Sequence, residues 1–192
     1  IFNLYHLPFS QAINIPILIS RNVKIFPLKG NIKIDAKVST GMIKIGLRSI
    51  PMFNHSLSYK TLFRLAKGSE TIFRGKFEIY NGTKITSGGK LSFGNNFVIT
   101  GNSSIICDNQ IDFGNDFLMS WECQLLDNDF HQVIIDGIKK LVQEPIQIGN
   151  KVWIGHHVII KKGVNMSDES LKLKLIKIKK ILDVTFYSGS IR

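Results

Sequence analysis

The sequence predicts an all-β solenoid, in which the chain winds into stacked coils of short parallel strands. The first observation is a six-residue spacing of apolar residues, which occurs in four runs: Ile79, Ile85 and Leu91; Phe93, Ile99 and Ile105; Phe113, Met119 and Leu125; and Ile148, Ile154 and Ile160. The second is a glycine after the first residue of three runs, in FGNNFV (93–98), FGNDFL (113–118) and IGNKVW (148–153). Neither the helical nor the simple strand period explains this spacing, whereas stacked repeats do.

Six residues provide one short strand and the turn that follows it. Three such sides close a triangular coil, and the parallel strands of successive coils hydrogen-bond along the length of the prism. The apolar residue of each six then points inward. We expect one buried column that contains Ile85, Ile99, Ile148 and Ile154. Glycine and asparagine are expected at the turns because they tolerate unusual backbone angles.

The repeats divide the chain into three segments. Residues 1–30 are predicted to cap the first coil, since an open end of stacked strands needs cover. Residues 31–165 are predicted to form the β-helix, with loop excursions near 47–70 and 131–145, where the spacing is lost. Residues 166–192 are predicted to form a divergent basic tail.

The composition of the 192 residues excludes several classes of protein. A hydrophobic content of 44% and a charged content of 20% indicate a folded domain rather than a disordered chain. Two cysteines, Cys107 and Cys123, form no disulfide framework and favour a reducing, cytoplasmic location. The apolar stretch INIPILI (13–19) is too short to span a membrane. The net charge of +11 attracts anions in general, but no basic motif with interleaved aromatic residues indicates nucleic-acid binding.

Two stretches carry a resemblance to a known family. The stretch IGNKVWIGHHVIIKKGV (148–164) resembles the hexapeptide-repeat acyltransferases, whose fold is a left-handed parallel β-helix. The stretch FGNDFLMSWECQLLDNDFH (113–131) resembles the segment that precedes the catalytic histidine in the sugar and capsular-polysaccharide O-acetyltransferases of that family. The resemblance covers residues 30–164. It implies a homotrimer that transfers an acetyl group from acetyl-CoA, its co-substrate, to a sugar or polysaccharide hydroxyl.

By this resemblance His131 is the general base. Moving an acetyl group from a thioester to an alcohol requires a group that removes the hydroxyl proton, and histidine does this near neutral pH. Asp127 and Asp129 precede it closely. A carboxylate there would fix the imidazole tautomer or bind sugar hydroxyls, and the residues do not decide which aspartate does which. No nucleophile motif with serine or cysteine occurs, so direct transfer without an acyl-enzyme is expected.

Trp153, Gly155 and Lys161 are the candidates for coenzyme binding. The resemblance makes Trp153 a wall of the acyl-CoA slot, whereas the alternative is a packing residue between coils. Lys161, with Lys162 beside it, would meet the phosphates of the coenzyme, or the two lysines form a solvated rim. Gly155 lies between the tryptophan and the lysines in the sequence.

His156 and His157 are the remaining histidines of this stretch. Because they are adjacent, we expect their side chains to face different ways, so they cannot chelate one ion as an i, i+4 helical pair does. No metal site is expected.

After Val164 the sequence departs from the family pattern, since NMSDESLKLKLIKIKK (165–180) lacks the aliphatic-glycine spacing. This departure supports a second functional class, an inactive or truncated β-helical relic or scaffold that lacks coenzyme binding. Thermal stabilisation by CoA separates the two classes, because a ligand that binds only the folded state raises its stability.

Overall fold

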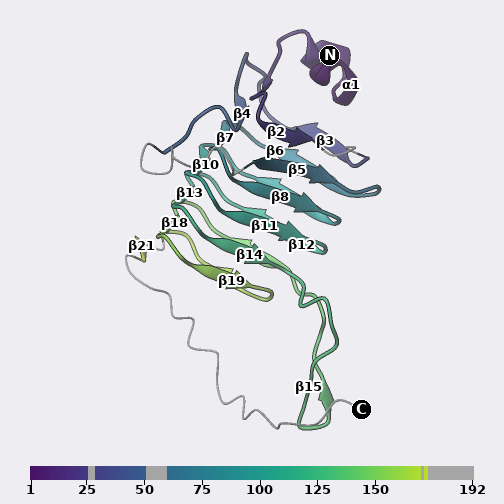
Figure 1. Cartoon of the computed structure of the whole chain (residues 1–192), viewed down its shortest axis with the longest axis vertical. Coiled ribbons are helices and arrows are strands. Elements are labelled where there is room, and N and C mark those ends of the chain that lie inside the picture. The colour runs from purple at the N-terminus through teal and green to yellow at the C-terminus, as the bar shows by residue number, and fades with distance from the viewer. Residues whose placement is uncertain (26–28, 51–59, 170, 173–192) are drawn as a thin grey trace.

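The computed structural model describes residues 1–25, 29–50, 60–169 and 171–172, and within them most regular structure is β-strand (Figure 1). Three parallel sheets, called here sheets A, B and C, take successive strands of the chain in turn. Each coil therefore contains one strand of each sheet, and the coils stack along the long axis of the molecule (Figure 1). The fold is a left-handed parallel β-helix, which confirms the predicted class.

The described strands are short. Sheet A contains β1 (Ile17–Ile19), β4 (Ile43–Ile45), β7 (Phe77–Ile79), β10 (Phe97–Ile99), β13 (Leu118–Met119), β18 (Trp153–Ile154) and β21 (Leu171–Lys172). Sheet B contains β2 (Val23–Ile25), β5 (Thr61–Leu65), β8 (Lys84–Ser87), β11 (Ser104–Cys107), β14 (Gln124–Leu126) and β19 (Ile159–Lys161). Sheet C contains β3 (Asn31–Ile34), β6 (Glu70–Phe73), β9 (Lys90–Phe93), β12 (Gln110–Phe113), β17 (Ile146–Ile148) and β20 (Asn165–Met166).

The six-residue spacing is the step from one sheet to the next. Phe93, Ile99 and Ile105 lie in β9, β10 and β11, and so in sheets C, A and B. A column instead joins residues that pair across neighbouring strands of one sheet, such as Phe113 and Ile148 in sheet C. Each run of the repeat thus describes one coil rather than one column.

The prediction that Ile85, Ile99, Ile148 and Ile154 form one column is wrong for this reason, although all four residues are buried. Ile85 lies in sheet B, Ile148 in sheet C, and Ile99 and Ile154 in sheet A. All four have at most 4% of their surface exposed. Burial of one such side chain contributes roughly 1.5–3 kcal/mol, so the repeat supplies much of the driving force for folding.

A double row of phenylalanines fills the corner between sheets C and A. Phe73, Phe93 and Phe113 stack with ring centroids 5.4 and 5.6 Å apart. The parallel row is formed by Phe77, Phe97 and Phe117, with centroids 5.1 and 4.9 Å apart. Rings of the two rows meet edge-on or tilted, which is a favourable geometry for aromatic pairs. The coil of β17 and β18 ends the rows because Ile148 and Val152 replace the phenylalanines.

The glycines at this corner allow close stacking of the coils rather than a reversed backbone. A Cβ on Gly94 would lie 2.2 Å from the carbonyl oxygen of Gly114, and one on Gly114 would lie 2.6 Å from the backbone of Gly149. Positive φ angles occur two residues later, at Asn96, Asp116 and Lys151. The positive φ angle expected of these glycines is therefore found at the fourth residue of the motif.

An asparagine ladder joins the same corner from coil to coil. The side-chain oxygens of Asn95, Asn115 and Asn150 accept hydrogen bonds from the backbone N–H of Lys76, Asn95 and Asn115, at 2.8–2.9 Å. Asp168 ends the ladder by accepting from the N–H of Asn150, and this hydrogen bond lowers the pKa of its carboxyl.

The N-terminal segment covers the first coil. Helices α1 (Phe2–His6) and α2 (Phe9–Ala12) lie over one end of the stack, and Asn3 exchanges two 2.9 Å hydrogen bonds with the backbone of Ile17 (Figure 1). The β-helix begins with β1, earlier than the boundary expected at residue 31, because these first strands pair in register without a glycine repeat. Similarly, β5 is a wall strand inside the expected excursion at 47–70, of which 51–59 lies outside the described residues.

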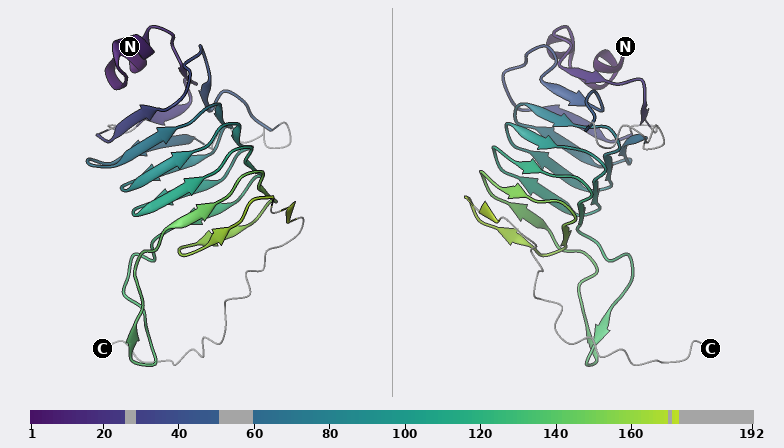
Figure 2. Two further views of the ribbon diagram at one scale, coloured as in Figure 1. Left: turned by 180° about the vertical axis from the view of Figure 1, so that it is seen from behind. Right: turned by 60° about the vertical axis from the view of Figure 1, so that its left-hand side comes forward.

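Between β14 and β17 the chain leaves the prism as an arm, residues 127–145, that carries a hairpin of β15 (Ile134–Ile135) and β16 (Ile138–Lys139). Figure 2 shows the arm projecting away from the coils, at the opposite end from the N-terminal helices. At the start of the predicted tail, β21 pairs with β18 as the first strand of a further coil, while 173–192 lies outside the described residues. No helix in the described ranges is long and apolar enough to cross a membrane.

Candidate functional site

The base of the arm is fixed to the coil of β18, β19 and β20 by Lys162. Its Nζ lies 2.7 Å from Oδ2 of Asp129 and 4.0 Å from Oε1 of Glu144, and it donates to the carbonyl of Leu141. The side chains of Lys162 and Asp129 are only 14% and 16% exposed. A partly buried ion pair is less screened by salt than an exposed one, so this contact ties the base of the arm to the prism wall. The ammonium of Lys162 is therefore paired within the chain, and Lys162 does not belong to an exposed rim of lysines.

Asp127 has a structural role in this chain. Its side chain is fully buried, and Oδ1 and Oδ2 accept hydrogen bonds from the backbone N–H of Asp108 and Asn109 at 2.8 and 2.9 Å. These bonds hold the turn between β11 and β12. Burial, together with the charge of Asp127, raises the pKa of the Cys107 thiol. Asp127 therefore does not contact His131 in this arrangement, because both of its carboxylate oxygens bond to the turn.

His131 lies on the exposed side of the arm, between its base and the hairpin. Neither aspartate contacts it: Asp129 is paired with Lys162, and no hydrogen bond or ion pair of His131 occurs among the described residues. The backbone around it is ordered by neighbours, since Gln132 Nε2 donates to the carbonyl of Lys140 at 2.7 Å. The imidazole of His131 is thus accessible, and the arm that carries it is tied to the prism at its base.

The predicted coenzyme residues are divided between two corners. Trp153 projects outward from sheet A, 39% exposed, with Nε1 3.4 Å from Oγ of Ser120. Gly155 follows at the corner between sheets A and B, and a Cβ there would meet nothing within 4 Å. Lys161 is exposed at the other end of β19, beside the base of the arm. One chain therefore brings Lys161 toward the arm that carries His131, and leaves Trp153 and Gly155 at a different corner.

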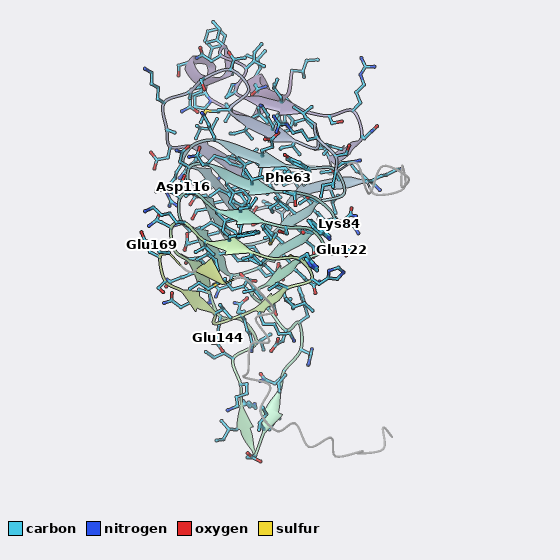
Figure 3. All side chains as sticks on the ribbon, turned by 90° about the vertical axis from the view of Figure 1, so that its left-hand side faces the viewer. Phe63, Lys84, Asp116, Glu122, Glu144 and Glu169 are labelled. Atoms are coloured by element: carbon cyan, nitrogen blue, oxygen red, sulfur yellow. The ribbon has the colours of Figure 1, made fainter. Side chains whose placement is uncertain are left out.

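A cluster that the sequence analysis missed lies at the corner of sheets A and B. The ring of His156 stacks on Trp121, with centroids 5.2 Å apart and planes 4° from parallel. Its Nδ1 lies 2.7 Å from Nδ1 of His157, whose Nε2 lies 2.5 Å from Oε2 of Glu122. Figure 3 shows Glu122 at an edge of the prism, apart from Glu144 near the arm.

The expectation that His156 and His157 face different ways is wrong. His157 has a positive φ of 56°, and this bend at the corner brings the two adjacent rings together. The register in which the strands pair explains why these four residues lie together. Leu118 pairs with Trp153, so residues 121–122 of one coil stack on residues 156–157 of the next.

The hollows described on the prism lie away from the candidate residues. A hollow of about 470 Å³ over sheet C is lined by Arg74, Asp112, Gln147 and Asn165. Another, of about 420 Å³, lies near the N-terminal cap at Pro8, Ile32 and Asp35. Among the described residues, no three His, Cys, Asp or Glu side chains are grouped as a metal site.

The chain matches no protein-family model, and it has no significant match among curated proteins or solved structures.

Proposed function

We propose that this chain is an O-acetyltransferase, which moves an acetyl group from acetyl-CoA to a hydroxyl of a sugar or polysaccharide. His131 acts as the general base, and transfer is direct. The proposal rests on the resemblance of residues 113–131 and 148–164 together with the β-helical fold.

The observation that carries the proposal is the presentation of His131. The side chain is exposed on an arm whose base is held by the Lys162–Asp129 ion pair. A general base must reach the proton that it removes, and it must be held in place while the acceptor binds. The ion pair holds the backbone of the arm that carries His131, while the exposed imidazole stays free to reach an acceptor hydroxyl.

Trp153 and Gly155 would bind the coenzyme at the corner of sheets A and B. The exposed indole supplies an apolar wall, and the missing side chain of Gly155 leaves room for a ligand to lie along the prism. Lys161 would meet the phosphates as an exposed cation. Asp129 supports the site indirectly, by anchoring the arm through Lys162.

These groups form one site only if a second chain takes part. His131 and Trp153 belong to different corners of the same prism, so the arm of one chain must meet the coenzyme corner of another. A ring of identical chains repeats this contact, and three prisms around one axis are the arrangement that the resemblance implies. We therefore propose a homotrimer as the active form.

Two measurements test the proposal. Purified protein should release CoA from acetyl-CoA in the presence of a panel of sugar and polysaccharide acceptors. CoA should also raise the melting temperature, by an amount that grows with its concentration. Protein that shows neither transfer nor stabilisation would support the alternative, a β-helical scaffold without coenzyme binding, over the enzyme.

A further inference from the structure

The hydrogen bonds of the cluster at the corner of sheets A and B fix where its protons lie. Glu122 can only accept, so Nε2 of His157 carries the proton that faces it. In neutral His157 the Nδ1 atom is then an acceptor, and Nδ1 of His156 must donate the 2.7 Å bond between the rings. Nε2 of His156 is left for a ligand, with no partner among the described residues.

This arrangement holds His156 ready to exchange a proton at Nε2. Trp121 fixes the plane of the ring by stacking, while His157 and Glu122 fix its rotation and tautomer. His157 and the Glu122 carboxylate form a hydrogen-bonded chain behind His156, on the side away from its Nε2. A carboxylate that orients an imidazole and stabilises its cation is the arrangement that catalytic histidines use.

We propose that His156 is a second catalytic residue, which protonates the thiolate that leaves the acyl group. The proposal rests on the acyl transfer described above and assigns its leaving-group step. The position supports this assignment, since His156 follows Gly155, the open point of the corner, and comes three residues after the exposed Trp153.

The other described histidines are unsuited to the step. His6 belongs to the N-terminal cap, where partial burial lowers its pKa and disfavours the charged form. Both ring nitrogens of His157 are engaged within the cluster. His131 already takes the hydroxyl proton in the proposed reaction. His156 is therefore the described imidazole with a free nitrogen and an orienting partner.

The proposed step is balanced. The acceptor oxygen bonds to the acyl carbon as its proton passes to a ring nitrogen of His131. The carbon–sulfur bond then breaks, and the sulfur takes the Nε2 proton of protonated His156. Exchange with water afterwards removes the proton from His131 and returns one to His156.

The two histidines that act on one acyl group must come from different chains. Strand β19 separates His157 from Lys162, and extended chain rises about 3.3 Å per residue, which places the two corners roughly 15 Å apart. The arm that carries His131 starts at the second corner and projects away from the coils (Figure 2), so His131 and His156 of one chain cannot both touch the same carbonyl. Each site therefore combines His156 of one copy with His131 of another.

The first test varies the leaving group. His156→Ala should slow transfer from acetyl-CoA by ~10²-fold, as expected for loss of a general acid. It should slow transfer much less from an acetyl thioester of an aromatic thiol, whose thiolate leaves without protonation. His131→Ala should slow both reactions alike. Glu122→Gln, which removes only the charge, should give a smaller loss with the same leaving-group pattern, and melting temperatures check that each variant folds.

An equal loss with both thioesters, or no loss, in His156→Ala would overturn the assignment while leaving the acyl transfer intact. Wild-type protein that transfers from neither thioester would overturn the proposed function, and the assignment with it.

The second test mixes chains. The His131→Ala and His156→Ala proteins should each be nearly inactive alone. After dissociation and random reassembly together, one site in four receives both histidines, so activity should recover to about a quarter of wild type. A mixture that stays at the level of its separate components would contradict a site shared between copies.

Discussion

The ammonium of Lys162 lies 2.7 Å from the carboxylate of Asp129 and joins the arm to the wall of the prism. Asp129 belongs to the arm, whereas Lys162 follows β19 in the wall of the prism. The ion pair ties the arm, which carries His131, to the coil of β18, β19 and β20. The same coil carries the proposed coenzyme corner.

Replacing Lys162 with methionine should loosen the arm without unfolding the prism. The variant leaves Asp129 without its cation, so backbone amides of residues 129–143 should exchange faster with deuterated solvent. Acetyl transfer should fall at the same time. Lys161→Met is the matched control, since Lys161 is exposed and should leave amide exchange in the arm unchanged. Unaltered exchange in Lys162→Met would show that the ion pair does not brace the arm.

Asp127→Ala should destabilise the whole chain. The substitution leaves the partly buried N–H groups of Asp108 and Asn109 without their acceptors, and the loss of each hydrogen bond should cost about 1 kcal/mol. Urea unfolding should therefore show a lower midpoint. Asp35→Ala serves as control, because Asp35 is exposed. If Asp127→Ala is as stable as this control and loses only activity, Asp127 belongs to the substrate site instead.

Ile154→Asp should prevent folding, because it would place an unpaired carboxylate among apolar side chains at a cost of several kcal/mol. Ile138→Asp makes the same change on the exposed hairpin of the arm and should leave the circular dichroism spectrum unchanged. A soluble Ile154→Asp protein with wild-type unfolding behaviour would contradict the inward position of this residue.

Stability should decrease at alkaline pH because of the two buried cysteines. Burial raises the pKa of both thiols, so the folded chain keeps their protons where the unfolded chain releases them. The folded state then binds more protons, and the free energy of unfolding falls as pH rises above the usual thiol pKa near 8.5. For a thiol that is ionised only in the unfolded chain, the slope approaches about 1.4 kcal/mol per pH unit at the alkaline end of this range. Cys107→Ala should reduce the slope; an unchanged slope in urea titrations from pH 8.5 to 10 would oppose this account.

The sequence predicted the features that repeat. The spacing of Phe93, Ile99 and Ile105 identified the coil, because inward-facing positions recur at every side whatever the loops between them do. The sequence did not predict the first strands, β1 and β2, because they carry no glycine repeat. Only their pairing with β4 and β5 identifies them as part of the β-helix.

The candidate site was less predictable, since its contacts depend on which coils stack. The two aspartates before His131 look alike in sequence but differ in their contacts. Asp127 is buried and accepts hydrogen bonds from a turn, whereas Asp129 forms an ion pair with Lys162. The rings of His156 and His157 come into contact because the backbone of His157 has a positive φ angle. His157 reaches Glu122 because the strand register stacks their two coils. Neither can be read from a single motif.

The measurement that tests the account most directly is the acetyl-transfer rate of His131→Ala beside its melting temperature. If His131 is the general base, transfer should fall by ~10²- to 10⁴-fold. The melting temperature should stay close to that of wild type, because this exposed side chain has no described hydrogen bond or ion pair to lose. A variant that folds and transfers acetyl groups at the wild-type rate would contradict the central claim.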